Sequence, residues 1–210
     1  MMKTEIRAFE FDVEANENEE HGHFLSGRAV VFDKPADLFS PRVGEFREYI
    51  DKGALDGTDL RDVRFLVNHN TDMIPLARSR NNNENSTMQL LVGEEGMDIR
   101  VDLDIDNNAE AKSLYSAVQR GDITGMSFMM VVDKDRWEDA ETEQPVRRVQ
   151  SISKILEVSA VTFPAYAQTS ISTRGLSEAL DSAADSLESE RSRLAEIKRR
   201  KQKIRILSEV

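Results

Sequence analysis

Alternating hydrophobic and polar residues recur along most of the chain, and this period of two predicts β-strands. The predicted strands lie at residues 4–13, 24–32, 64–70, 88–92, 97–105, 126–132 and 152–163. The acidic stretch 14–20 and the polar stretch 133–148 interrupt the pattern; the first is predicted to be a loop and the second a long surface loop or the tip of a hairpin, with the loop favoured. Because long helical spacing is confined to two segments, the pattern predicts an α+β fold that is mostly β.

Helical spacing first appears between Asn107 and Gly121. The apolar residues there follow the i, i+3, i+4, i+7 stripe of an amphipathic helix: Ala111, Leu114, Tyr115 and Val118. Asn107 is the predicted N-cap, Glu110 completes a capping box, and Gly121 is the C′ glycine expected to end the helix. This helix leads directly into the segment Gly121–Met130.

The second helical segment is a C-terminal tail with a heptad pattern. Nine positions alternate at spacings of four and three residues, and seven are apolar: Leu176, Leu180, Ala183, Leu187, Glu190, Leu194, Ile197, Lys201 and Ile204. Residues 178–190 are acidic, whereas 191–205 hold eight Lys and Arg against one Glu. We therefore divide the chain into a domain at 1–175 and a helical tail at 176–210. The tail is predicted to pair with itself or with another protein; the alternatives are docking on the domain and partial disorder.

Composition narrows the classes of function. The formal net charge of −11 argues against broad nucleic-acid binding, because a phosphate backbone would be repelled. The absence of cysteine excludes disulfides, a cysteine nucleophile and thiolate metal sites. No apolar run approaches the ~20 residues needed to span a bilayer, and the N-terminus opens no secretory segment. We therefore expect an intracellular protein without membrane contact.

Ser127, His69 and Glu157 are polar residues placed within or at the end of apolar strand patterns. Ser127 could be a small strand residue bonded to a backbone carbonyl, and His69 a core histidine. Glu157 needs a partner if it is buried; Lys154 lies on the opposite strand face, which makes His69 the stronger candidate. An imidazole that a carboxylate orients is what a serine hydroxyl needs to become a nucleophile. The sequence thus suggests a Ser-His-Glu site, in a chain order unlike the familiar hydrolases.

Metal sites find little support in the sequence. His21 and His23 could share a strand face, but no third ligand stands at a convincing spacing. The acidic run 102–106 resembles the start of a calcium loop, yet Asn107 and Ser113 replace the required glycine and bidentate glutamate. We expect neither a metal nor any other cofactor.

Five ordered motifs make residues 5–175 resemble the prohead maturation proteases of tailed bacteriophages. The motifs are Phe46–Glu48 with Gly53–Leu55, Val67–Asn70, Pro75–Arg78, Arg120–Phe128 and Leu156–Tyr166. The family is related in fold to the herpesvirus assemblins, so the resemblance implies a β-barrel core with peripheral helices.

The resemblance also implies an activity and its residues. It implies a serine endopeptidase that acts in the host cytoplasm, inside the immature capsid, on scaffold or capsid-protein extensions and often on itself. Ser127 would be the nucleophile, His69 the general base and Glu157 the orienting acid, while Arg78 is a possible oxyanion or substrate contact. The expected partners are the major capsid protein or scaffold and further copies of the chain, with no nucleic acid. From the heptad and charge pattern of the tail, we further expect residues 176–210 to target the protease into the prohead or to be cleaved off by the protease itself.

One departure from the family pattern bears on activity. Gly-Phe usually follows Ser-Phe in the family, but this chain has Met129 and Met130. A methionine in place of glycine removes backbone freedom and fills space near the nucleophile, which would narrow the substrate groove or weaken catalysis. The alternative function is therefore a catalytically silent assembly factor of the same fold. An esterase is disfavoured, because the Gly-x-Ser-x-Gly pattern is incomplete.

Overall fold

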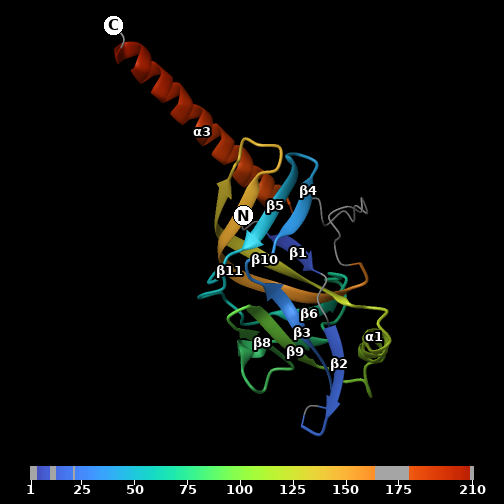
Figure 1. Cartoon of the computed structure of the whole chain (residues 1–210). Coiled ribbons are helices and arrows are strands. Elements are labelled where there is room, and N and C mark those ends of the chain that lie inside the picture. The colour runs from blue at the N-terminus through green and yellow to red at the C-terminus, as the bar shows by residue number, and fades with distance from the viewer. Residues whose placement is uncertain (1–3, 10–12, 21, 164–179, 209–210) are drawn as a thin grey trace.

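The residues that the structure describes form two β-sheets, one packed helix and one projecting helix (Figure 1). The structure is a computed structural model, and it describes residues 4–9, 13–20, 22–163 and 180–208. The predicted α+β, mostly β class is confirmed. The strands of the described residues form open sheets and no closed barrel, so the expectation of a β-barrel core is not met there.

The seven-stranded sheet is organised around its longest strand, β11. Its members are β1 (Glu5–Phe9), β10 (Gly125–Glu138), β11 (Val146–Val161), β5 (Gly44–Ile50), β4 (Ala36–Ser40), β6 (Arg64–Val67) and β7 (Ala77–Arg78). Strand β10 runs antiparallel along one edge of β11. The other edge pairs in parallel with β5 at one end and with β6 at the other. The β6 end of β11 carries Glu157, so that residue is held from both sides.

The second sheet is antiparallel and has four strands in the order β2-β3-β9-β8. These are β2 (Val13–Asn18), β3 (Gly22–Val31), β8 (Met88–Val92) and β9 (Gly96–Asp102), and the 3-10 turn η1 (Arg80–Asn82) precedes β8. Apolar residues of both sheets form one continuous core, including Leu25, Val30, Phe65, Met97, Val101, Met126, Phe128, Met130 and Val158. The residues that alternate with this core on β10 and β11 include Ser127 and Glu157.

Two predicted loops are strands in the structure. The acidic stretch after residue 13 forms β2, because its main chain pairs with β3 while Val13 faces the core. The polar stretch 133–148 is mostly a continuation of the β10–β11 hairpin, with only its tip at 139–145 outside the strands. In both cases main-chain pairing with a neighbouring strand outweighs the polar composition, a contribution that local patterns do not report.

Helix α1 (Ala109–Gln119) packs its predicted apolar stripe on the core. The N-cap is Asn108 rather than the predicted Asn107: its side chain accepts hydrogen bonds from the backbone N–H groups of Glu110 and Ala111. Gly121, with φ of 75°, ends the helix as predicted, and its N–H donates to the carbonyl of Val118. The turn aims the chain into β10.

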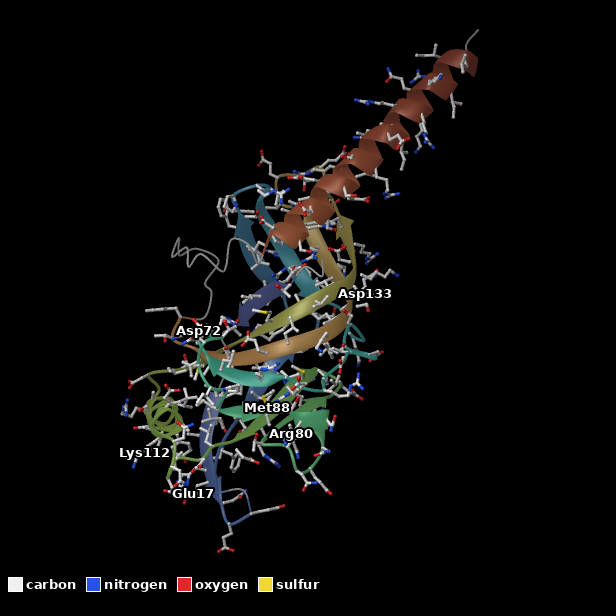
Figure 2. The ribbon with its side chains drawn as sticks, turned by 180° about the vertical axis from the view of Figure 1, so that it is seen from behind. Glu17, Asp72, Arg80, Met88, Lys112 and Asp133 are labelled. Atoms are coloured by element: carbon white, nitrogen blue, oxygen red, sulfur yellow. The ribbon has the colours of Figure 1, made fainter. Side chains whose placement is uncertain are left out.

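Helix α3 (Asp181–Ser208) is docked by its first turns and then leaves the body (Figures 1 and 2). Leu180 and Ala183 pack on Phe46, beside Trp137. Trp137 Nε1 donates to Ser186 Oγ (3.1 Å), and Arg42 binds Asp185 and Glu188, at 2.7 and 2.9 Å. The boundary predicted between residues 175 and 176 lies outside the described residues. No helix in the described ranges is long and apolar enough to cross a membrane.

A buried cluster of charges joins β1, β5 and β11. Glu5, Arg7, Glu48 and Arg147 are each at most 2 % exposed. Arg7 donates hydrogen bonds to the carboxylates of Glu5 and Glu48. Arg147 donates to the same two groups, at 2.6 Å to Glu5 Oε2 and 2.9 Å to Glu48 Oε2. Arg147 Nε also donates to Asp135 at 2.6 Å. Buried charges are tolerated when they are paired in this way, and removing one partner leaves another uncompensated.

The pKa of Glu5 links this cluster to acid stability. Burial alone would raise the pKa, but the guanidinium groups of Arg7 and Arg147 and hydrogen bonds from Arg147 and Ser182 outweigh burial and lower it from 4.5 to about 2. Because the folded pKa is depressed, the stabilisation is complete above pH 4.5 and is lost as pH falls toward 2.

We therefore expect the free energy of unfolding of the unmodified chain to fall more steeply between pH 4.5 and 2 than that of Glu5→Gln. Urea unfolding at a series of pH values measures the difference. Parallel pH profiles for the two proteins would contradict the assignment.

Candidate active site

Ser127 lies on the face of β10 that alternates with the core. Its neighbours Met126 and Phe128 are fully buried in the core. In the antiparallel ladder, Ser127 is directly opposite Ser159 of β11, and Met129 is directly opposite Glu157. Residues opposite one another in an antiparallel pair share a face. The register therefore brings the serine and the carboxylate predicted for the site to one face of two adjacent strands.

His69 reaches this face through a turn and not through a strand. Strand β6 ends at Val67, and Asn68 and His69 both adopt left-handed backbone conformations, with φ of 52° and 56°. The Asn68 side chain secures the turn: it accepts from the N–H of Thr162 (2.9 Å) and donates to Thr162 Oγ1 (3.0 Å). The prediction that His69 continues the apolar strand face is therefore wrong. Asparagine and histidine are among the residues that tolerate this conformation best.

Three hydrogen bonds link His69, Glu157 and Ser159 in a closed ring. His69 Nδ1 lies 2.5 Å from Glu157 Oε1, and Ser159 Oγ donates to Glu157 Oε2, also at 2.5 Å. The backbone N–H of His69 donates to Ser159 Oγ at 3.2 Å. Both carboxylate oxygens are thus satisfied, which a side chain only 4 % exposed requires. A carboxylate at Nδ1 favours the tautomer that carries its proton there and leaves Nε2 free to accept one.

The Ser127 hydroxyl has a different partner in this conformation. It donates to the backbone carbonyl of Arg7 at 2.9 Å, and the side chain is fully buried. Of the three predicted site residues, the structure joins His69 and Glu157 by a direct hydrogen bond, and it places Ser127 on the same sheet face with its hydroxyl bonded to Arg7 instead. For a transfer of its proton to the imidazole, the O–H of Ser127 must turn away from the Arg7 carbonyl.

A β-bulge lies beside Glu157. Met129 pairs with Glu157 but the next residue, Met130, pairs with Ile155, so Leu156 is an extra residue in β11. Bulges of this kind bend a strand and re-aim its side chains, and they are common next to active sites. Met129 itself is half-buried on the Ser127 face. The residue that departs from the expected Gly therefore adjoins both Ser127 and Glu157.

The other residues weighed from the sequence have structural partners. Arg78 forms an ion pair with Asp62 on the neighbouring β6–β7 side of the sheet. Lys154 lies 3.5 Å from Asp59 and not beside Glu157. His23 packs edge-on against Tyr115, with ring centroids 5.0 Å apart, while His21 lies outside the described residues. Within the described ranges, no three His, Asp or Glu residues are grouped as a metal site would need.

Comparison of the chain with known protein families shows which family it belongs to. The family described as caudovirus prohead serine protease matches residues 9–182. The chain belongs to this family. No curated protein and no solved structure matches it. The matched range contains β10, β11 and the turn that carries His69, so the prohead protease family and the hydrogen-bonded ring coincide on the same part of the chain.

Sequence reasoning missed two groups at this candidate site. Ser159 could have been predicted from the sequence. Glu157 and Ser159 are polar residues two positions apart on an otherwise apolar strand, and side chains two apart on a strand lie on the same face. The Arg7 carbonyl gave none, because a backbone acceptor carries no information in the residue type. Its role follows only from the pairing of β1 with β10.

Ser159 provides a direct test of the ring. We expect Ser159→Ala to lower kcat by about ten- to a hundredfold, the equivalent of a lost hydrogen bond to a charged group at about 1.5–3 kcal/mol. KM should change little, because Ser159 is fully buried. Steady-state kinetics on a cleavable peptide measures both constants.

Ser153→Ala is the matched control on the same strand, because the Ser153 hydroxyl bonds only to the Val131 carbonyl, at 3.3 Å. Ser153→Ala should leave kcat within about twofold of the unmodified value, because substitutions of exposed residues usually have small effects. Equal kcat values for Ser159→Ala and the unmodified chain would show that Glu157 is positioned without Ser159.

Proposed function

We propose that this chain is a serine endopeptidase in which Ser127 is the nucleophile, His69 the general base and Glu157 the orienting acid. The observation that carries the proposal is the His69–Glu157–Ser159 ring on the sheet face of Ser127. Membership of the prohead serine protease family supports the reaction class.

The proposed reaction starts from the tautomer that the ring favours. The Ser127 hydroxyl turns from the Arg7 carbonyl, Nε2 of His69 takes its proton, and Oγ attacks the scissile carbonyl carbon. Glu157 stabilises the imidazolium at Nδ1 without taking the proton. The imidazolium then protonates the leaving amine as the C–N bond breaks, which leaves an acyl-serine. Water, deprotonated by the same imidazole, cleaves the ester and restores Ser127.

The proposed substrates are the major capsid protein or scaffold, cut inside the assembling prohead in the host cytoplasm, and the chain itself. The family supports a role in prohead maturation. Co-expression with the capsid protein of the same phage, followed by mass spectrometry of the products, tests this part. Cleavage of the capsid or scaffold protein that disappears in the Ser127→Ala variant is the expected result; intact partners in both cultures would contradict it.

A second candidate is a catalytically silent assembly factor. Two observations favour it: Ser127 is fully buried with its hydroxyl bonded to Arg7, and Met129 occupies space beside it. Met129→Gly should then expose the site and raise the rate on bulky peptides at least severalfold. No change in rate or in substrate preference would show that Met129 does not restrict access.

Fluorophosphonate labelling separates the two candidates. An active serine hydrolase is expected to take up one label, located on Ser127 by peptide mapping and absent from Ser127→Ala. A label on Ser159 would reassign the nucleophile to the other strand. A chain that takes no label is the silent assembly factor, and a label gained by its Met129→Gly variant would show that Met129 is what closes the site.

A further inference from the structure

The distal part of α3 is an uncovered, strongly basic helix. Lys198 of α3 forms an ion pair with Glu141 of the body, with 2.6 Å between Nζ and Oε2. Residues 199–207 beyond it are all exposed. Figure 2 shows their side chains standing clear of the body, at the opposite end from Lys112 of α1.

Large apolar side chains lie on this exposed helix. Ile204 is 67 % and Leu207 69 % exposed. Together with Leu194 and Ile197 they form what we call the distal seam: at 100° per residue, the four side chains fall within about 140° of the helix circumference. Leu194, Ile197 and Ile204 continue the heptad pattern whose first part, Leu180 to Leu187, is already buried against the body, and Leu207 flanks it. Leu194 and Ile197 are half-buried, whereas Ile204 and Leu207 are exposed, so the fold buries the first part of the pattern and leaves its distal end accessible.

Charge is distributed unevenly between the helix and the rest of the chain. Residues 191–208 hold eight Lys and Arg residues and one acidic residue, Glu196, which gives a net charge of +7. Because the whole chain has a net charge of −11, the remaining residues together carry −18. Lys201 lies between Ile197 and Ile204 within the seam. A charged residue at one seam position selects its partner and costs stability unless that partner supplies the opposite charge.

The charge pattern disfavours a second copy of this helix as the partner. Parallel pairing would place Lys201 beside Lys201, and antiparallel pairing of the distal segment would still set basic residues against basic residues. The acidic half of a second α3 is occupied, because Asp185 and Glu188 bind Arg42 in their own chain. Nucleic acid would neutralise the charge but would leave the distal seam in water.

We propose that the distal seam binds an acidic amphipathic helix of a partner protein as a two-stranded coiled coil. The partner's apolar residues would cover Ile197 and Ile204, and its carboxylates would meet Lys201 and the flanking cations. This inference deepens the proposed function: the partner would be the capsid or scaffold protein, and the contact would bring the chain into the prohead.

The first experiment uses the full-length chain and a synthetic probe. The probe is a labelled heptad peptide with Leu at a and d and Glu at e and g; the comparison probes have Lys at e and g or are a 20-base-pair duplex DNA. We expect fluorescence anisotropy to show binding of the acidic peptide only. Binding should weaken at least tenfold in a seam variant, Ile197→Ser with Ile204→Ser, and in a charge variant, Lys201→Glu with Lys203→Glu.

The matched control exchanges the same amount of charge on the body, Lys52→Glu with Lys112→Glu, and should bind as the unmodified chain does. Circular dichroism checks that the variants keep the helix. Loss in the charge variant alone would reduce the contact to unspecific attraction and overturn the coiled coil. Tighter binding of the duplex, or a dimer in sedimentation that the seam variant abolishes, would overturn it in favour of nucleic acid or of a second copy.

The second experiment counts copies of the chain in proheads assembled with the capsid protein of the same phage. The seam variant should be packaged at least tenfold less, with its rate of peptide cleavage unchanged. Unreduced packaging would refute the role in targeting. A chain that binds the acidic peptide and enters proheads but cleaves nothing would sustain this inference while refuting the proposed protease.

Discussion

Replacing Ser127 by Ala is expected to reduce the rate of peptide cleavage by about 10⁴- to 10⁶-fold, the range found when a serine nucleophile is removed. The register that places Ser127 opposite Ser159 leaves Ser127 as the serine on this face whose hydroxyl is not already committed to Glu157. Ser127→Ala keeps the strand and removes one hydrogen bond, to the Arg7 carbonyl, so folding should be retained. Kinetics on a peptide that spans a mapped cleavage site measures the loss.

His69 should behave as part of the same unit. His69→Ala is expected to cost nearly as much as Ser127→Ala, and the double variant no more than either, because residues that act together in one step are not additive. The control is His23→Ala: His23 lies on β3 of the second sheet, its ring packs on Tyr115 of α1, and its loss should not affect the rate. Additive losses, or a His69→Ala enzyme of normal rate, would remove the imidazole from the reaction.

The largest effect on stability is expected from Arg7→Met. Arg7 is 2 % exposed and compensates two buried carboxylates, Glu5 and Glu48. Methionine fills similar space but leaves both negative charges facing one another with only Arg147 between them. Breaking a buried pair of this kind costs about 3–5 kcal/mol. Urea unfolding at pH 7 should show this loss in the free energy of unfolding.

Arg28→Met is the matched control, because Arg28 also binds two carboxylates, on Glu95 and Asp98, yet is 35 % exposed. Its loss should be below about 1 kcal/mol, since water screens exposed pairs. Similar losses for the two variants would mean that the cluster around Arg7 is no more than a surface network.

The strands of the core were predictable because burial on one side imposes a period of two, as in Met97 to Val101 and in Met126 to Met130. Helix α1 was predictable from its stripe and from Gly121, although its N-cap moved by one residue because two neighbouring asparagines offer the same side chain. The four-charge cluster was not predictable. Glu5, Arg7, Glu48 and Arg147 come from distant segments, and each reads locally as an ordinary exposed strand residue.

The candidate site was likewise predictable from the sequence only in part. Glu157 was conspicuous because a carboxylate within an apolar strand must find a partner, and the predicted partner His69 is the one observed. The turn that delivers His69 was missed, because paired left-handed residues at Asn68 and His69 depend on the clamp to Thr162 across the sheet. The roles of Ser127, His69 and Glu157 in catalysis, and the kinship with assemblins, stay predictions.

The position of strand β1 restricts how a peptide could be recognised beside Ser127. β1 pairs with β10 from Met126 to Met130, and β11 pairs with the opposite edge of the same residues. Neither edge of the strand that carries Ser127 is open, so an incoming chain gains no ladder of amide bonds there, as it does where peptides add to an exposed sheet edge. For the endopeptidase proposed above, we therefore expect selection at this point to depend on which side chains fit around Met129, and cleavage motifs to be defined by residue shape.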